Sequence, residues 1–181
     1  MQSIICLLRG TNVGGKRAVK MNVLRALIES LGHTSVRTHI QSGNVVFETK
    51  ERNLNRLTEQ LERALEKTFG FPIPVMLRTR EELEAVIRTN PFAKHSAVES
   101  SKLLVLFHGE GALKTAAERV RAIKADPEIV HYLGRELYVY FPNGVGKTKL
   151  PLASLDKAVG VATTGRNWNT VLKLLEIAKG K

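Results

Sequence analysis

Short apolar runs alternate along the chain with stretches in which apolar residues recur every three or four positions. The runs predict strands, and the longer periodicity predicts helices that bury one face. In the first half of the chain this pattern predicts a strand, a helix, a hairpin of two strands, a helix and a strand. These elements cover residues 3–8, 21–31, 36–40, 45–48, 54–65 and 73–78. The predicted order is therefore βαββαβ.

The same order of elements returns in the second half, although almost none of the sequence is repeated. A strand is predicted at 102–108, a helix at 116–123 and a hairpin of two strands at 129–133 and 136–141. A short helix at 152–159, a short strand at 161–163 and a closing helix at 168–179 follow. Between the halves, Thr79 and Glu82 have the spacing of a capping box. They open a connecting helix that ends at Asn90-Pro91.

Split βαβ units of this kind form a ferredoxin-like α/β plait, in which an antiparallel sheet carries helices on one face. We therefore predict an α/β (α+β) protein built by duplication from two ferredoxin-like βαββαβ halves, with antiparallel sheets and helices packed on one face. The predicted first half covers residues 1–79, the connecting helix and loop cover 80–101, and the second half with its C-terminal helix covers 102–181.

The chain has an excess of basic residues, which favours anionic binding partners. Of the 181 residues, 28 are Lys or Arg and 17 are Asp or Glu, which gives a formal net charge of +11. Such a charge attracts phosphate polymers, nucleotides and anionic surfaces, and it also raises solubility. A small anionic ligand and nucleic acid are therefore the partners to weigh, whereas the sequence assigns no oligomeric state.

The single cysteine and the lengths of the apolar runs indicate the compartment. Cys6 has no second cysteine with which to form an internal disulfide, which fits a reducing cytosol. No apolar run is long enough for a signal-peptide core or a membrane span. We therefore expect a cytoplasmic protein that does not associate with membranes.

Two glycine-containing segments resemble phosphate loops and fail at particular positions. Residues 10–17 nearly match the Walker A pattern, which needs Ser or Thr directly after the Lys and a helix that starts there. Arg17 occupies that position, and the helical periodicity begins only at Met21. In the second segment, which ends with residues 146–148, Phe141 stands where the upstream Gly of the motif belongs. A P-loop NTPase is excluded.

The first glycine-rich loop has a second route to anion binding. Consecutive glycines, Gly14 and Gly15, leave backbone N–H groups free to form an anion-binding nest. The basic residues around them are Arg9, Lys16, Arg17 and Lys20. The alternative is a plain connection that uses glycine for its turns.

Polar residues at the first hairpin, Gln41-Ser42-Gly43-Asn44, are expected beside this loop, because strands one and three of a βαββαβ sheet are neighbours. The alternative is a hairpin sequence chosen for its turn geometry.

A basic residue at the start of the predicted closing helix is a further hint. Thr and Asn residues in 163–170 account for capping of the helix, but a cation there opposes the helix dipole. Arg166 is therefore expected to meet an anion or a carboxylate. The candidate anion-binding residues are Arg9, Gly14, Gly15, Lys16, Gln41, Asn44, Arg166 and Asn167.

Other kinds of site find no support in the sequence. The five histidines lack the paired spacing of metal ligands, and no pair of carboxylates suggests acid–base catalysis. We therefore predict no metal site and no cofactor. The central strands of the first half carry one aromatic residue, Phe47, whereas RRM domains stack RNA bases on several.

Five motifs spread across the chain resemble those of one bacterial family. They are L-R-G-T-N-V-G-G at residues 8–15, Q-S-G-N-V-V-F at 41–47, N-P-F at 90–92, P-N-G-V-G-K-T-K-L at 142–150 and R-N-W-N-T-V at 166–171. With them the chain resembles the bacterial domain of unknown function 1697 family. The resemblance implies two intertwined ferredoxin-like halves in a cytoplasmic protein and no established activity. Thr11 stands where the family usually has Ile, and Gly165 where Thr or another small residue is common.

Three hypotheses about function follow. The first is a protein that binds a phosphate-bearing small molecule or nucleotide in a cationic loop pocket. The second is a nonspecific nucleic-acid-binding module driven by charge. The third is a protein-interaction domain without ligand chemistry. The sequence singles out no catalytic base, so enzymatic activity is not assigned.

Overall fold

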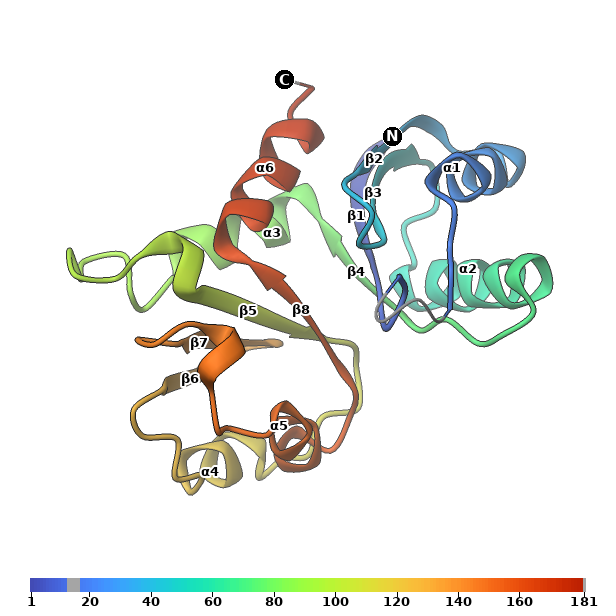
Figure 1. The fold of residues 1–181 in the computed structure, drawn as a ribbon. Helices are drawn as coiled ribbons and strands as arrows, with labels where there is room; N and C mark the ends of the chain where they lie inside the picture. The colour runs from blue at the N-terminus through green and yellow to red at the C-terminus, as the bar shows by residue number, and fades with distance from the viewer. Residues whose placement is uncertain (13–16, 181) are drawn as a thin grey trace. The chain divides into compact units, whose positions relative to one another are not determined.

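The chain forms two compact units, each built around its own sheet (Figure 1). A computed structural model describes residues 1–12 and 17–180. Unit 1 comprises Met1–Glu84 and the segment from Lys173 onward, and unit 2 comprises Ala85–Leu172. The boundaries fall inside two helices, α3 (Arg80–Arg88) and α6 (Trp168–Ala178), so each of these helices contributes to both units.

The sheet of unit 1 has the strand order β2-β3-β1-β4, with antiparallel pairing throughout. Its elements are β1 (Gln2–Leu8), α1 (Met21–Ser30), β2 (Thr34–His39), β3 (Asn44–Thr49), α2 (Leu54–Phe69) and β4 (Val75–Thr79). The central strand β1 places Cys6 opposite Val45 on one side and Leu77 on the other. This is the ferredoxin-like order predicted for the first half.

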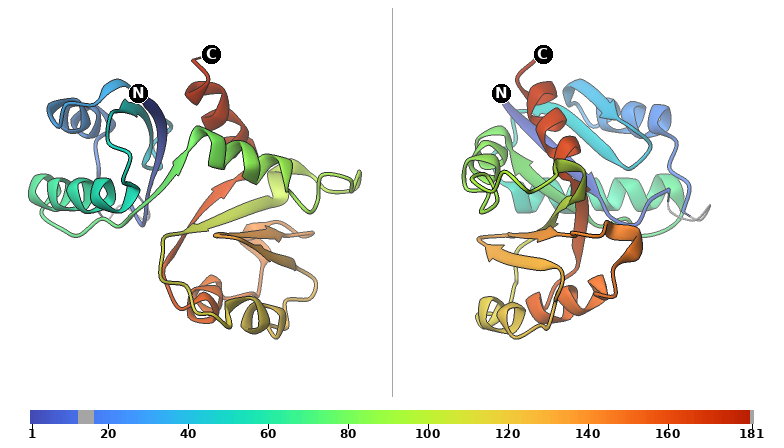
Figure 2. Two further views of the ribbon diagram at one scale, coloured as in Figure 1. Left: turned by 180° about the vertical axis from the view of Figure 1, so that it is seen from behind. Right: turned by 60° about the vertical axis from the view of Figure 1, so that its left-hand side comes forward.

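Unit 2 repeats this topology with the strand order β6-β7-β5-β8. Its remaining elements are β5 (Leu103–His108), α4 (Ala116–Arg121), β6 (Ile129–Leu133), β7 (Glu136–Tyr140), α5 (Leu152–Val159) and β8 (Thr163–Asn167), with 3₁₀ turns at Ser100–Lys102 and Val145–Lys147. Helices α4 and α5 cover one face of the sheet (Figure 2). The predicted α+β fold of two ferredoxin-like halves is confirmed.

Alternation along the strands separates the core of each unit from the outer face of its sheet. In unit 1, Ile4, Cys6 and Leu8 point toward the side where α2 buries Leu57 and Leu61. In unit 2 the corresponding core contains Leu106, Leu137, Val139, Val120 and Leu155. Each fully buried aliphatic side chain of this kind contributes about 1.5–3 kcal/mol. Because successive side chains of a strand point to opposite faces, the residues next to these core residues in each strand lie on the face of the sheet that points away from the helices.

The start of α3 and the last strand, β8, compare differently with their predictions. The capping box is confirmed: the Thr79 N–H donates to Glu82 Oε2 (2.8 Å), and the Glu82 N–H donates to Thr79 Oγ1 (3.1 Å). The last strand differs from its prediction, because β8 pairs with β5 from Thr163 to Asn167. Arg166 therefore lies within a strand and not at a helix start. Its polar sequence joins the sheet because β5 offers an open edge, and pairing outweighs the weak local preference.

None of the helices within residues 1–12 and 17–180 combines the length and the apolar character that crossing a membrane requires.

Candidate functional site

In unit 1, one asparagine joins the loop after β1 to the β2–β3 hairpin. The Asn12 Nδ2 donates to the carbonyl oxygens of Val19 (3.0 Å) and Gln41 (2.8 Å), and the Val19 N–H donates to Asn12 Oδ1 (2.8 Å). The Asn12 N–H also donates to the Arg17 carbonyl (3.2 Å). The predicted neighbourhood of loop and hairpin is therefore present, held by an asparagine that the sequence analysis did not single out.

Close packing at Gly43 fixes the same junction. The Leu8 N–H donates to the Gly43 carbonyl (2.8 Å), and Gly43 has φ +69°. A Cβ at this position would lie 2.6 Å from Thr11 Oγ1 and 2.7 Å from Leu8 Cβ. Thr11 is 4% exposed, and its hydroxyl has no hydrogen-bond partner among the described residues. Only glycine fits between these two side chains.

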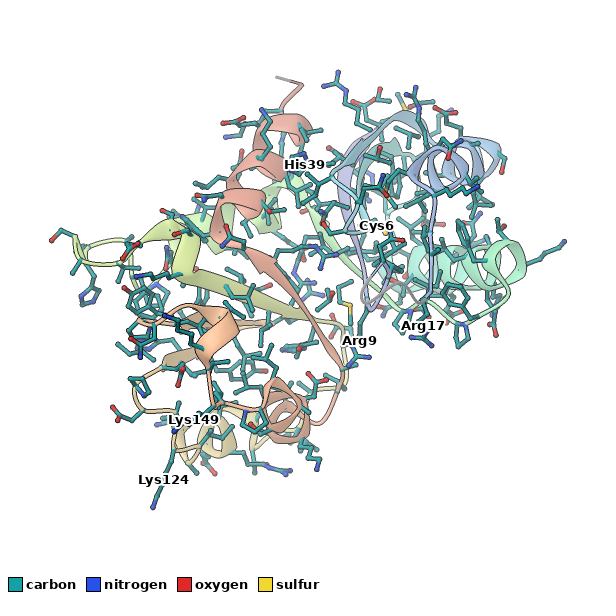
Figure 3. The ribbon with its side chains drawn as sticks, viewed as in Figure 1. Cys6, Arg9, Arg17, His39, Lys124 and Lys149 are labelled. Atoms are coloured by element: carbon teal, nitrogen blue, oxygen red, sulfur yellow. The ribbon has the colours of Figure 1, made fainter. Side chains whose placement is uncertain are left out.

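Two arginines lie beside this junction, at the end of unit 1 where β1 ends (Figure 3). The Arg9 N–H donates to the Pro74 carbonyl (2.9 Å), which fixes the backbone at that position. The guanidinium of Arg17 lies over the Phe71 ring, 5.4 Å from its centroid, and Nη1 is 3.6 Å from where a Cβ on Gly10 would be. Positive charge is thereby held against the loop backbone.

The hairpin residues have different roles in the structure. Asn44 is fully buried, and its Nδ2 donates to the His39 carbonyl (3.1 Å) and to Ser42 Oγ (2.8 Å), so these contacts close the turn. Gln41 is exposed and receives Asn12 through its backbone carbonyl. The remaining candidates of this loop, Gly14, Gly15 and Lys16, lie outside the described residues.

Arg166 and Asn167 belong to unit 2. Arg166 is 6% exposed, and its Nη1 donates to Thr164 Oγ1 (3.0 Å) and to the Gly165 carbonyl (2.8 Å). Asn167 Oδ1 accepts from the Asn169 N–H (3.0 Å) at the start of α6, and its Nδ2 donates to the Ser101 carbonyl (2.8 Å). Arg9 and Arg166 lie in different units, and their joint pocket stays a prediction.

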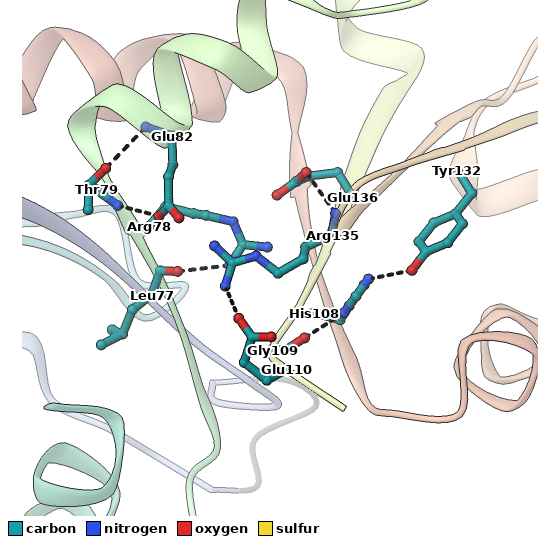
Figure 4. A network of polar contacts seen from close by, with 10 residues as sticks. All are labelled: Leu77, Arg78, Thr79, Glu82, His108, Gly109, Glu110, Tyr132, Arg135 and Glu136. Carbon is teal, nitrogen blue, oxygen red and sulfur yellow. Dashed lines mark hydrogen bonds and ion pairs between the residues drawn. The ribbon is translucent and has the colours of Figure 1, made fainter. Parts of the chain in front are cut away.

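A buried histidine and a half-buried tyrosine form a polar pair in unit 2 that the sequence analysis missed (Figure 4). His108 is 1% exposed, and its Nδ1 lies 2.7 Å from the Gly109 carbonyl oxygen. A carbonyl only accepts, so Nδ1 carries a hydrogen and donates it, and Nε2 lies 3.1 Å from the Tyr132 hydroxyl. Burial raises the pKa of Tyr132, and the nearby charge of Glu136 raises it further, which keeps the hydroxyl protonated.

Arg78, in unit 1, is a second buried polar residue that was missed. It is 1% exposed, and its Nη1 donates to the Leu77 carbonyl (2.8 Å). A charged residue inside the apolar run of β4 was the available signal. His108 gave a similar signal at the end of the apolar run of β5, but local sequence does not reveal which partner such a residue will meet.

The second segment that resembled a phosphate loop has a structural role in unit 2. Thr148 Oγ1 donates to Glu128 Oε1 (2.6 Å) and accepts from the Leu150 N–H (3.0 Å). Glu128 is itself buried. The hydroxyl that would hold Mg²⁺ in a true phosphate loop is therefore used to fix the chain entering α5.

The described residues form no cluster of three or more His, Cys, Asp or Glu side chains suited to a metal ion. The aromatic residue of β3, Phe47, is fully buried in the core, 4.7 Å from the His33 ring by centroid distance. It therefore does not stand on the outer face of the sheet of unit 1, where an RRM would present it.

Comparisons with known proteins agree with the fold and identify the family. No curated protein matches the chain. The chain is similar to a solved structure described as conserved bacterial protein SP0830 from Streptococcus pneumoniae, with a TM-score of 0.77, 24% identity and coverage of 98% of each chain. At 24% identity this likeness shows a shared fold and nothing about activity. Residues 1–138 match the family model described as Protein of unknown function (DUF1697), and the chain therefore belongs to this family.

Proposed function

We propose that the loop between β1 and α1 of unit 1, together with the β2–β3 hairpin, binds a small phosphate-bearing anion. The observation that carries this proposal is the set of hydrogen bonds made by Asn12, which ties both sides of the loop to Gln41. A loop held in advance loses less conformational entropy when a ligand orders it. Such anchoring favours a binding loop over a plain connection.

The charge of this region supports the same ligand class. The first 28 residues contain five Lys and Arg residues and no Asp or Glu. Three of these cations, Arg9, Arg17 and Lys20, lie in the part of the loop that the structure describes, and the side chains of Arg17 and Lys20 are exposed. An anion here would meet cations with no carboxylate close in sequence to compete for them.

The backbone of the loop adds a third argument. Asn12 has φ +57° and Arg17 has φ +55°, in the left-handed region that non-glycine residues rarely adopt. Such conformations cost of order 1–3 kcal/mol each and gather at ligand clamps. In this proposal Gly14 and Gly15 supply backbone N–H donors and Lys16 supplies charge, as expected from the sequence. Gln41 orients the ligand.

The test is a thermal-shift titration of the intact chain with pyrophosphate, ADP and a short DNA duplex, each at low and high salt. A ligand present at about 100 times its Kd stabilises the folded state by about 2.7 kcal/mol, a rise in Tm of several degrees. We expect pyrophosphate or ADP to raise Tm, and Arg9→Ala and Arg17→Ala to lose most of that rise relative to their own ligand-free Tm.

The matched control is Arg25→Ala, which removes one exposed arginine of α1 that is paired with Glu29 (2.8 Å). This variant should keep the full ligand-induced rise. If it loses as much as the loop variants, the effect is net charge and not a site. Stabilisation by the duplex alone, falling steeply with salt, would support the nonspecific nucleic-acid alternative. No stabilisation by any of the three would favour the protein-interaction domain.

A further inference from the structure

Unit 2 carries a group of aromatic and imidazole rings gathered around Phe92, in edge-on and tilted contacts. We define the ring patch as Phe92, His95, His131 and Tyr140. The Phe92 ring centroid lies 5.1 Å from that of His131 in an edge-on arrangement, 5.9 Å from Tyr140 and 6.2 Å from His95. Phe92 is 5% exposed, Tyr140 is half-buried, and both imidazoles are exposed.

The ring patch lies on the outer face of the sheet, opposite α4 and α5. Val139 belongs to the core on the helix side, so its neighbour Tyr140 points the other way. Tyr140 is opposite Ile129, and His131 is opposite Tyr138. Tyr138 is buried and donates its hydroxyl to the Val86 carbonyl (2.8 Å), so the accessible rings are those toward the edge strand β6.

The rings are held in place by the segment that follows α3. Asn90 Oδ1 accepts from the Phe92 N–H (2.9 Å), and the His95 N–H donates to the Phe92 carbonyl (3.0 Å). The Tyr140 hydroxyl donates to the Ala97 carbonyl (3.4 Å). The N-P-F motif therefore builds a turn that brings Phe92 under the other rings, which a merely connecting loop would not need.

The positive charge of unit 2 indicates which kind of ligand the ring patch would bind. Unit 2 contains 12 Lys and Arg residues against seven Asp and Glu residues, so it is positively charged. Two apolar side chains of β6 are exposed beside the rings, Ile129 (46% exposed) and Leu133 (43% exposed). Two exposed imidazoles and a half-buried tyrosine ring on a positively charged unit match a polyanion that also has flat aromatic faces. We propose that the ring patch binds single-stranded nucleic acid by stacking bases on His131 and Tyr140. It is the outer face of a βαββαβ sheet that RRM domains use for this purpose.

The experiment measures fluorescence anisotropy of a labelled 12-nucleotide oligouridylate with the full chain at moderate salt. Stacking on one ring is sequence-tolerant and its loss weakens binding by roughly tenfold. We expect His131→Ala and Tyr140→Ala each to weaken binding by about that factor, and Tyr140→Phe to bind as the wild type does. His39→Ala in unit 1 is the matched histidine control and should bind normally.

Two further probes separate stacking from charge. A DNA duplex and an abasic strand of the same length carry the phosphates without accessible base faces, so both should bind the wild type more weakly than the oligouridylate. Equal binding of the abasic strand would overturn the proposal, as would unchanged binding by both alanine variants. Absence of binding, with a dimer in sedimentation that Ile129→Ser and Leu133→Ser dissociate, would instead make this face an interface between copies of the chain.

Discussion

Asn12 makes more structural contacts than its place in a polar loop suggests. Its side chain accepts one backbone hydrogen bond and donates two, and these connect segments that are 29 residues apart in the chain. A side chain that both donates and accepts in this way is difficult to replace, because aspartate lacks the donors and alanine lacks both.

Asn12→Ala should therefore destabilise the protein by about 1–3 kcal/mol, since three backbone groups lose their partners. The measurement is Tm by circular dichroism, with an expected fall of several degrees. Asn22→Ala, at an exposed position of α1, is the control and should change Tm little. Equal effects of the two substitutions would show that the loop is not anchored by Asn12.

A second residue-scale prediction concerns His33. Its ring is 8% exposed and stacks near Phe47, Nε2 has no hydrogen-bond partner among the described residues, and burial lowers the pKa of His33 from its ordinary value of 6.5. The unfolded chain therefore binds the proton more readily. The stabilising contribution is complete above pH 6.5 and is lost as the pH falls from 6.5 toward the folded-state pKa.

His33→Phe should remove this part of the pH dependence while keeping an aromatic ring in the core. The measurement is Tm between pH 5 and pH 8 for the wild type, for this variant and for His39→Phe as control. We expect the curve of the His33 variant to be flatter on the acid side. A curve that parallels the wild type would mean that other groups cause the acid sensitivity.

At the scale of elements, the β2–β3 hairpin depends on close approach as well as on backbone conformation. Gly43 has φ +69° and no room for a Cβ, whereas Gly32, before β2, has φ +87° and no heavy atom within 4 Å of a built Cβ. The two glycines therefore separate the cost of a left-handed backbone from the cost of steric overlap.

Gly32→Ala should cost about 1–2 kcal/mol for its backbone conformation. Gly43→Ala should cost about 1–3 kcal/mol more, because the new methyl group overlaps Thr11 Oγ1 and Leu8 Cβ. The measurement is the Tm difference between the two variants. If both lower Tm equally, the hairpin has shifted to accept the methyl group, and the ligand-induced rise of Gly43→Ala should then be tested as well.

Most elements could be predicted from the sequence, because their signals are local. The helix from Met21, the capping box of Thr79 and the hairpin on either side of Gly134 all follow from spacing or turn chemistry within a few residues. The sequence places the last strand at 161–163, whereas β8 runs from Thr163 to Asn167. Thr-Thr-Gly-Arg-Asn carries no apolar alternation, and its pairing is decided by β5, about 60 residues away.

The candidate site was less accessible to prediction for the same reason. Placing the first loop beside the hairpin followed from topology, but the tie through Asn12 depends on a side chain reaching backbone carbonyls on two segments. The pairing of His108 with Tyr132, 24 residues later, and the contact of His131 with Phe92 likewise depend on strand register. Residue type and spacing alone do not encode such contacts.

At the scale of the whole molecule, the C-terminal segment is part of unit 1. Leu174 is 1% exposed, and Ile177 and Ala178 line a small cavity of about 80 Å³ together with Ser3 and Val46. Lys179 pairs with Glu84 at 3.0 Å, both side chains being well exposed. The apolar contacts matter more than this ion pair, because exposed pairs contribute little.

Removal of residues 173–181 should therefore lower Tm by several degrees and expose apolar surface of unit 1, since the burial of Leu174 and its neighbours is lost. The measurements are Tm and binding of a hydrophobic dye. Lys179→Ala, which removes only the ion pair, should leave both close to the wild-type values. A truncated chain that melts like the full one would show that unit 1 does not need the segment.

The discontinuity of unit 1 has a consequence for how the protein is made. Ribosomes deliver the chain from its N-terminus, and domains generally fold as they emerge. Residues 1–84 appear first, yet the last residues that complete their unit are synthesised only after all of Ala85–Leu172. Unit 1 therefore cannot be completed until unit 2 has been synthesised, and a premature stop near residue 172 would release a chain that holds all of unit 2 and leaves an apolar surface of unit 1 uncovered.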